Sequence, residues 1–392
     1  MNRRPFGVYV HVPFCAARCD YCDFATWTDR SHLVGEYVDA CVRDVDRREL
    51  PPATSVFFGG GTPSLLDAAQ LARILSAITR AAGAEVTVEC NPDSVDRALL
   101  EAYAAAGVNR LSFGVQSMRP HVLSALGRTH DPGAVTRAAE WARAAGFTRV
   151  NLDLIYGGDG ESLADWDDTL DAALALEPTH VSAYALTVEP GTPLGRAVAD
   201  GRRAAPDDDL QAAKYERADE RLGAAGLRWY EISNWARPGD ECRHNLLYWA
   251  QGEYAGIGCA AHGHTVGSAG TARRWWNVRT PERYIAAVAA GEGPVAGEET
   301  LLPAERTAEL LGLALRTRDG IKLRRLGADL LGVDQCLDEL TAAGLVVRRG
   351  DAASLTRRGR LLASEVSARL LAALDAAGEP SPPSAPAAAG TR

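Results

Sequence analysis

The fold is decided by one short stretch, His11-Val-Pro-Phe-Cys15-Ala-Ala-Arg-Cys19-Asp-Tyr-Cys22-Asp-Phe24. It follows a β-branched run at residues 8–12 that is typical of a buried strand. Its three thiols lie at CxxxCxxC spacing. Three thiolates can bind three irons of a [4Fe–4S] cluster and leave the fourth iron open to a small molecule. A zinc site completed by His11 or another cysteine is the alternative, and unliganded structural cysteines are a weaker one.

Short apolar runs alternate with longer amphipathic ones over the first 227 residues. We predict strands at residues 8–12, 55–58, 85–90, 110–115, 148–155 and 180–186, and helices at 32–48, 68–82, 96–106, 133–145, 163–176 and 207–225. Repeated strand–helix units imply right-handed crossovers and a parallel α/β sheet. The periodicity fits both a closed or partly closed barrel and an open doubly wound sheet.

The pattern changes in the second half of the chain. We expect a barrel domain over residues 1–235, including one more strand at 229–232, and an aromatic and glycine-rich connecting region over 236–298. Residues 299–375 have a winged-helix pattern, with helices at 304–315, 330–343 and 358–371 and strands at 345–348 and 353–355. Residues 376–392 are rich in Ala, Pro, Ser and Gly and predict a disordered tail.

Composition restricts the functions that need to be considered. The chain has 392 residues, a hydrophobic fraction of 46% and a net charge of −9, which disfavours general nucleic-acid binding. No apolar run approaches the roughly 20 residues that span a bilayer. The clustering of three of the eight cysteines, with the others scattered, favours metal binding in a reducing compartment over disulfides. These features predict a soluble, cytoplasmic protein.

Polar and glycine residues recur where the predicted strands end. Gly59-Gly-Gly-Thr-Pro63 follows the second strand, and Glu89, Gln116 and Asp153 close the next three. The carboxyl ends of parallel strands lie on one rim, where ligands bind. Each residue alone also fits a solvated strand end or a helix cap. Together with the cysteine loop, the set predicts one binding site.

The cysteine spacing after a first strand resembles the radical S-adenosylmethionine (SAM) superfamily. The motifs of its oxygen-independent coproporphyrinogen III oxidase group are matched by Tyr9–Cys15, Gly59–Pro63, Glu89–Pro92, Phe113–Gln116, Leu126–Arg128, Asn151–Gly157 and Leu355–Ala363. This resemblance implies a partial (β/α)6 barrel followed by a small winged-helix-like α+β domain. It also implies that Cys15, Cys19 and Cys22 hold the cluster. By the same resemblance SAM is surrounded by Tyr9, Gly60, Gly61, Thr62, Glu89, Gln116, Arg128, Asp153 and Ala185.

Two departures from the oxidase itself point to its sister branch, the heme chaperone HemW family. Phe24 stands where the oxidase has a further cysteine, and the oxidase's N-terminal extension is missing. The family's HNxxYW motif is matched by His244, Asn245, Tyr248 and Trp249. The resemblance implies heme binding by these four residues, with the imidazole as an axial ligand. A buried histidine among packed aromatic rings is the structural alternative.

Several nearby residues are weaker candidates or local departures. Cys242 fits a small buried residue better than a thiolate ligand. His262 and His264 lie in a glycine-rich turn that we expect near the cofactor site. After Tyr156-Gly157 the chain has Gly158-Asp159, where the family has a hydrophobic residue or Thr and then Pro.

The leading hypothesis is therefore a cytoplasmic heme chaperone that carries a [4Fe–4S] cluster with exchangeable SAM. The resemblance implies that it hands heme to an acceptor hemoprotein such as a membrane respiratory enzyme, and membrane contact is expected only through that acceptor. The alternative is an oxygen-independent coproporphyrinogen III oxidase, which Phe24 disfavours. A winged-helix regulator with a redox-sensing cluster is a third hypothesis, and the acidic charge balance disfavours it.

Overall fold

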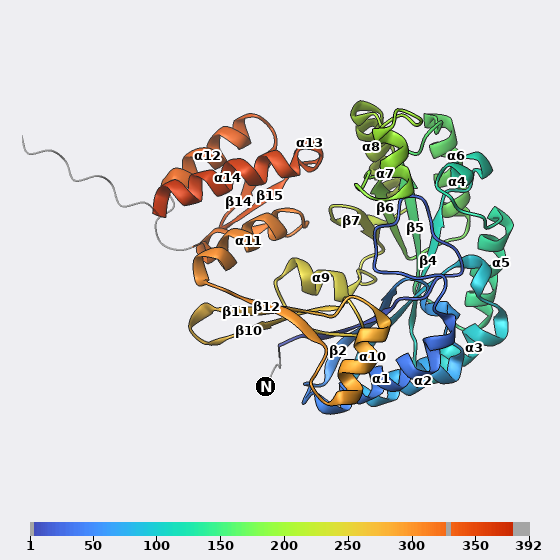
Figure 1. Cartoon of the computed structure of the whole chain (residues 1–392). Coiled ribbons are helices and arrows are strands. Elements are labelled where there is room, and N and C mark those ends of the chain that lie inside the picture. Colours follow the sequence, from blue (N-terminus) through green and yellow to red (C-terminus); the bar gives the residue numbers. More distant parts are fainter. Residues whose placement is uncertain (1–3, 327–330, 379–392) are drawn as a thin grey trace, which may run out of the picture. The chain divides into compact units, whose positions relative to one another are not determined.

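Six parallel strands in consecutive order form the centre of the structure, a computed structural model that describes residues 4–326 and 331–378. They are β1 (Phe6–Val12), β2 (Ala53–Gly60), β3 (Arg80–Cys90), β4 (Arg110–Gln116), β5 (Val150–Tyr156) and β6 (His180–Ala185). Because each strand pairs with its successor in the chain, right-handed crossovers place the helices on one face. The sheet curls around its other face, with the helices outside (Figure 1). This confirms the predicted barrel and excludes a doubly wound sheet, in which strand order reverses.

The outer layer consists of helices whose ends follow from local capping. They are α1 (Val34–Arg47), α2 (Ala68–Ala77), α3 (Arg97–Ala106), α4 (Pro120–Ala125), α5 (Pro132–Ala144), α6 (Leu163–Ala175), α7 (Pro193–Ala199) and α8 (Asp208–Ala224). Asp67 with Gln70 forms a capping box at the start of α2. The prediction that this helix continues to residue 82 is wrong, because Arg80 already pairs with Ala53 in the sheet.

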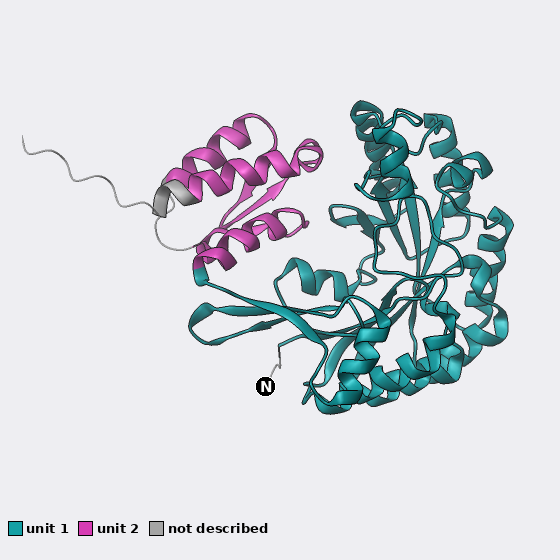
Figure 2. Cartoon of the chain, viewed as in Figure 1, with its two compact units in different colours: residues 1–303 teal, residues 304–392 magenta. Residues whose placement is uncertain are grey.

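The sheet continues beyond both edges of the six-stranded core. Next to β6 lies β8 (Asn234–Ala236), which is antiparallel to it, and β7 (Arg228–Glu231) then pairs with β8 in antiparallel orientation. On the other edge β9 (Glu253–Ile257) pairs in parallel with β1, followed by the antiparallel strands β10 (His262–Val266), β11 (Ala272–Asn277) and β12 (Val295–Leu301). The helices α9 (Arg243–Trp249) and α10 (Pro281–Ala290) belong to the same segment. The predicted connecting region thus lies within the first of two units, residues 1–303 (Figure 2).

The second unit comprises residues 304–392 and contains a small α+β domain. Its helices are α11, which starts at the boundary (Pro303–Leu315), α12 (Leu331–Ala342), α13 (Arg357–Leu361) and α14 (Ala363–Gly378). Its strands β13 (Ile321–Lys322), β15 (Ala352–Leu355) and β14 (Val346–Arg349) form one antiparallel sheet. The single helix predicted at residues 358–371 is divided into α13 and α14. Of the predicted tail, residues 376–378 end α14, and residues 379–392 lie outside the described part.

Among the described helices, none combines the length and the apolar character needed to cross a membrane.

Candidate functional site

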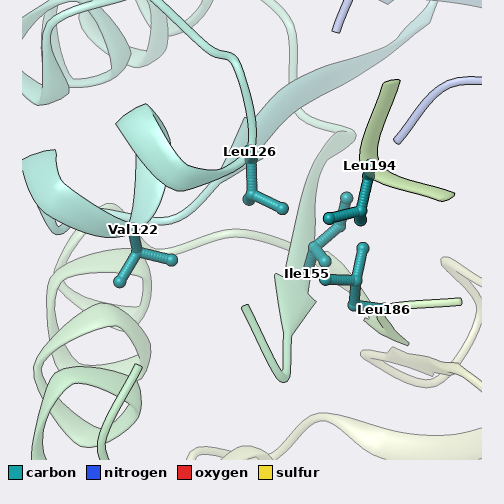
Figure 3. Packing of buried hydrophobic residues seen from close by; sticks show 5 residues of the cluster. All are labelled: Val122, Leu126, Ile155, Leu186 and Leu194. Carbon is teal, nitrogen blue, oxygen red and sulfur yellow. The ribbon is translucent and has the colours of Figure 1, made fainter. Parts of the chain in front are cut away.

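The cysteine loop that follows β1 is held against the carboxyl ends of the strands. The Cys15 N–H donates to the Trp27 carbonyl (3.0 Å), and the Leu194 N–H donates to the Asp20 carbonyl (2.9 Å). Tyr21 packs against a cluster of buried aliphatic side chains. The cluster residues come from the helices α4 and α7, from the residues directly after α4 and β6, and from the end of β5 (Figure 3): Val122, Leu194, Leu126, Leu186 and Ile155. Backbone hydrogen bonds and apolar packing thus fix the loop at the rim.

The loop forms one wall of a cavity of about 520 Å³. All three thiols line it, together with eight of the nine residues expected around SAM. Those eight are Gly60, Gly61, Thr62, Glu89, Gln116, Arg128, Asp153 and Ala185. Residues far apart in the sequence therefore meet, as the strand-end argument predicts. The ninth, Tyr9, is not among the lining residues.

The glycine loop after β2 packs directly against the cysteine loop. Gly61 N–H donates to the Val12 carbonyl and Thr62 N–H to the Phe14 carbonyl, both at 2.8 Å. A Cβ at Gly61 would lie 2.7 Å from the Phe14 oxygen and 3.0 Å from the Cys15 sulfur. Only glycine allows this close approach.

Arg128 connects the thiols to the strand ends. Its Nη1 lies 3.5 Å from the Cys19 sulfur, and its Nη2 donates to the Asn91 side chain (3.1 Å) and to the Gly114 carbonyl (2.6 Å). Its buried Nε has no hydrogen-bond partner among the described residues. A buried N–H without a partner is costly, so the site fits a ligand that brings an acceptor such as a carboxylate.

Two carboxyl groups lie on the strand side of the cavity. Burial, with a further contribution from Asp153, raises the pKa of Glu89 to about 8. Glu89 accepts a hydrogen bond from Gly60 N–H (3.1 Å). Burial also raises the pKa of Asp153, although the Ser112 hydroxyl and the Asn151 amide donate to it. A cationic group bound between the two carboxyls would restore their ionised forms.

Gln116 has a strained backbone at the end of β4. Its φ is +64°, in the left-handed region, where the pairing of β4 with β5 is irregular. Such strain is found where a bulge redirects a functional side chain. Gln116, the residue with this strained backbone, is one of the residues that line the cavity.

The thiols are chemically suited to a metal centre. Burial raises the pKa of Cys15 and of Cys22, although hydrogen bonds from Thr62 and Thr26 oppose the shift at Cys15. Bound irons would reverse this effect, because metal ligation needs the thiolate form of these cysteines. Within residues 4–326 and 331–378, no three His, Cys, Asp or Glu side chains could hold a single metal ion. Thiolates that each bind a different iron of one cluster lie farther apart than the ligands of one ion.

His11, considered as a zinc ligand, is held by other partners. It is 6% exposed, and its Nε2 bonds the Ala25 carbonyl at 2.9 Å. Its Nδ1 bonds the Tyr9 hydroxyl at 3.1 Å. Both ring nitrogens are used to fix the loop, so His11 is not available to a metal in this arrangement.

The HNxxYW residues lie apart from this cavity, on α9. His244 is 1% exposed, and its ring nitrogens bond the Ser55 hydroxyl (2.9 Å) and the Tyr248 hydroxyl (2.8 Å). Burial lowers the pKa of His244 to about 3. Asn245 and Trp249 are half-buried. As the structure stands, neither ring nitrogen of His244 is open to an iron.

Sequence reasoning did not single out several cavity-lining residues. Asn91, Ser112, Gly114 and Tyr184 lie next to predicted site residues on strands or just after them. Ser112 and Gly114 could have been predicted from Gln116, because alternate positions of one strand share a face. Asn91 was visible only as part of the Glu89–Pro92 motif.

Comparisons with known proteins agree with this architecture. The radical SAM superfamily model matches residues 9–173, and the HemN C-terminal domain model matches residues 301–362. The fold resembles coproporphyrinogen III oxidase (HemN) from Escherichia coli, with a TM-score of 0.80 over 94% of this chain and 90% of that one at 22% identity. Fold and site thus define a radical SAM protein with a HemN-type C-terminal domain.

Curated relatives then identify the branch. "Heme chaperone HemW" from Mycobacterium tuberculosis is 47% identical over 385 residues, covering 95% of this chain and 96% of the relative. The protein of the same name from Bacillus subtilis is 34% identical, covering 94% and 100%. The chain belongs to the heme chaperone HemW family.

Proposed function

We propose that the chain is a cytoplasmic heme chaperone that binds heme and transfers it to an acceptor hemoprotein. In the same proposal Cys15, Cys19 and Cys22 hold a [4Fe–4S] cluster, and SAM binds exchangeably at its open iron. The observation that carries the cofactor proposal is the shared cavity, in which three thiols face the glycine loop and the strand ends. The heme part is supported by the names of relatives that match nearly the whole chain.

The residues of the cavity suit the parts of SAM. The unpaired Nε–H of Arg128 would donate to its carboxylate, and Glu89 would accept from its amino group. The backbone of Gly60 and Gly61 leaves room for the methionine part, because it carries no side chain. A bound cluster supplies single electrons at an iron that is open to a small molecule. The chain's own contribution is to orient SAM against that iron.

Hemin binding followed by transfer tests the heme proposal. Anaerobically reconstituted protein is mixed with hemin, separated from free hemin by gel filtration, and then mixed with an apo-hemoprotein. We expect a shifted Soret band, retention of hemin by the chain, and its appearance in the acceptor. Failure to retain hemin would contradict the proposal.

The same preparation separates the proposal from the oxidase alternative. Phe24, 60% exposed, lines the cavity at the position where the oxidase has a further cysteine. We therefore expect no protoporphyrinogen when the protein is incubated with SAM, a reductant and coproporphyrinogen III. Formation of protoporphyrinogen would decide for the oxidase.

A further inference from the structure

A network of buried hydrogen bonds inside the barrel ends at Asp153, one of the residues that line the cavity. In the sheet, Asn151 lies opposite Ser112 on β4 and His180 on β6. The Asn151 Nδ2 donates to the Asp153 Oδ1 (2.8 Å) and to the Ser112 hydroxyl (2.7 Å), which in turn donates to the Asp153 Oδ2 (2.7 Å). Both oxygens of Asp153 therefore depend on how the amide of Asn151 is held.

His180 and Tyr230 continue this network away from the cavity. The His180 Nδ1 lies 2.6 Å from the Asn151 Oδ1, and the His180 Nε2 lies 2.8 Å from the Tyr230 hydroxyl. That hydroxyl accepts the N–H of Cys242, the residue directly before α9, at 3.4 Å. His180, Tyr230 and Cys242 are at most 2% exposed, and none of the three lines the cavity. These residues therefore touch no ligand in the cavity themselves.

The backbone at the far end of the network fixes which atoms donate. The Cys242 N–H can only donate, so the Tyr230 oxygen accepts from it and the Tyr230 O–H donates to the His180 Nε2. Burial, and after it the charge of Arg110, lowers the pKa of His180 well below its usual value. The ring is therefore neutral, and its one proton lies on Nδ1.

The amide of Asn151 passes this polarity on to the carboxyl group. Its Oδ1 accepts from the His180 Nδ1–H (2.6 Å) and from the Ser182 hydroxyl (3.2 Å), so its Nδ2 faces Asp153. The reversed amide would place its oxygen against the Asp153 carboxylate. Hydrogen bonds that all point the same way polarise one another, and here they all point toward Asp153. The network thus favours the ionised form of that carboxyl group.

This help matters because the surroundings of Asp153 oppose its charge. Charged and titratable groups that interact with it come from three other strands: Glu89 on β3, Arg110 on β4 and Tyr184 on β6. Burial raises the pKa of Asp153, and the hydrogen bonds that it accepts oppose this rise. The amino and hydroxyl groups of SAM donate hydrogen bonds, which are stronger to an ionised carboxylate than to a neutral one. Without the network, Asp153 would be ionised only at a higher pH.

We propose that His180 and Tyr230 are positioning residues for SAM, which act through Asn151 to hold Asp153 as an ionised hydrogen-bond acceptor in the cavity. The proposal deepens the cofactor binding proposed above and rests on it. A merely structural role of the two residues would lower stability without changing how the affinity for SAM depends on pH.

SAM binding as a function of pH tests the proposal. The full chain is reconstituted anaerobically, and its dissociation constant for SAM is measured by equilibrium dialysis between pH 6 and pH 9. Tyr230→Phe removes only the hydroxyl, and His180→Leu removes both ring nitrogens. We expect each variant to bind SAM at least about fivefold more weakly than the wild type at pH 6, with the difference narrowing toward pH 9. His180→Asn, whose amide nitrogen can replace Nδ1, should recover most of the affinity that His180→Leu loses.

Tyr103→Phe is the matched control. Tyr103 is also fully buried, and its hydroxyl donates to the Leu66 carbonyl (2.9 Å), outside the network. Its loss should lower stability but leave the pH dependence of SAM binding unchanged. The iron content of all variants should equal that of the wild type, because the network does not reach the thiols.

The tautomer of His180 gives a second readout that needs no SAM. In the full chain labelled with ¹⁵N-histidine and kept free of iron, NMR should show a neutral His180 ring protonated at Nδ1 from pH 6 to pH 8. Loss of this signal in His180→Asn assigns it. In Tyr230→Phe, where no hydroxyl donates to Nε2, the signal should shift toward the other tautomer.

The outcomes separate the two proposals. If the wild type binds no SAM, the proposed cofactor binding fails, and the positioning role fails with it. If the wild type binds SAM and both Tyr230→Phe and His180→Leu bind it equally well at pH 6, only the positioning role is overturned. An equal loss in Tyr103→Phe, or a His180 ring protonated at Nε2 in the wild type, would overturn it as well. If His180→Leu does not fold, Tyr230→Phe and the wild-type NMR spectrum still decide.

Discussion

His244 shows at the scale of one residue how burial changes the chemistry of a side chain. Its ring is stacked near Phe57, with centroids 5.4 Å apart, and bonded to Ser55 and Tyr248. Desolvation disfavours the charged imidazolium and lowers the pKa to about 3. The HNxxYW pattern could be seen in the sequence, but the burial of its histidine could not. Burial depends on the packing of α9 against β1 and β2, which are distant in the chain.

This burial predicts a pH dependence of stability. Between pH 6.5 and 3 the unfolded chain protonates His244 and the folded chain does not. Stability conferred by the neutral ring is therefore lost as the pH falls, by about 2 kcal/mol between pH 7 and pH 5. The His244→Asn variant should be less stable at pH 7, but its free energy of unfolding should fall by about 2 kcal/mol less than that of the wild type between pH 7 and pH 5. Urea midpoints at both pH values measure the difference, and equal losses in the two proteins would contradict it.

Gly61 predicts a steric effect on the cysteine loop. In Gly61→Ala the new Cβ would collide with the Phe14 carbonyl and approach Cys15. We expect a loss of about 1–3 kcal/mol of stability, as in overpacked sites, and less iron after reconstitution. The matched control is Gly35→Ala in α1, where a Cβ meets nothing within 4 Å. The control should be neutral or stabilising, and full iron loading in Gly61→Ala would refute the prediction.

At the scale of elements, a buried ion pair ties α8 to the loop after β5. The Lys214 Nζ lies 2.7 Å from the Glu161 Oε2, and both side chains are 0% exposed. The same oxygen accepts the Gly157 N–H at 2.6 Å. The pair thus fixes the segment that contains Gly158-Asp159, next to the cavity rim at Ile155.

Breaking this pair should cost far more than breaking an exposed one. Lys214→Met leaves the Glu161 carboxylate buried and unpaired, for an expected loss of about 3–5 kcal/mol. The double variant Lys214→Met/Glu161→Leu should recover part of that loss, because no lone charge remains. Arg97→Ala, which removes an exposed pair with Glu101, should cost only about 0.5 kcal/mol. Chemical denaturation measures all three, and additive losses in the double variant would contradict the account.

The elements differ in how far the sequence could predict them. β1 to β6 are β-branched runs between amphipathic helices, so periodicity identified them. The α2–β3 boundary was misplaced because the sequence Arg-Ala-Ala-Gly-Ala at residues 80–84 favours a helix locally, whereas its pairing with β2 makes it a strand. β9 to β12 were missed because their Tyr, Gly, His and Trp residues show no clear alternation. Their strand character depends on pairing with β1, some 250 residues earlier.

At the scale of the whole molecule, the cavity belongs entirely to the first unit. Its lining residues lie between Cys15 and Glu189, and that unit ends at Pro303. A chain that ends at Pro303 should therefore bind iron and sulfide as the full chain does. Metal analysis after anaerobic reconstitution, with circular dichroism as a folding check, measures this. A folded truncated chain without iron would contradict the prediction.

The cysteine site could be predicted from sequence more fully than the heme site. Cysteine spacing and strand ends specify positions locally, and the parallel order of the strands then brings them to one rim. The surroundings of His244 depend instead on the packing of α9 against β1 and β2, which are distant in the chain. No local pattern states that packing, so only the structure shows that the ring nitrogens of His244 are bonded to Ser55 and Tyr248.

The proposed binding of a [4Fe–4S] cluster by Cys15, Cys19 and Cys22 can be measured directly. Iron and acid-labile sulfide are counted in protein prepared without oxygen, alongside the variant in which all three cysteines are replaced by serine. The account predicts about four irons and four sulfides per wild-type chain and none in the variant. A wild-type chain that carries zinc or no metal, or a variant that keeps its iron, would contradict it.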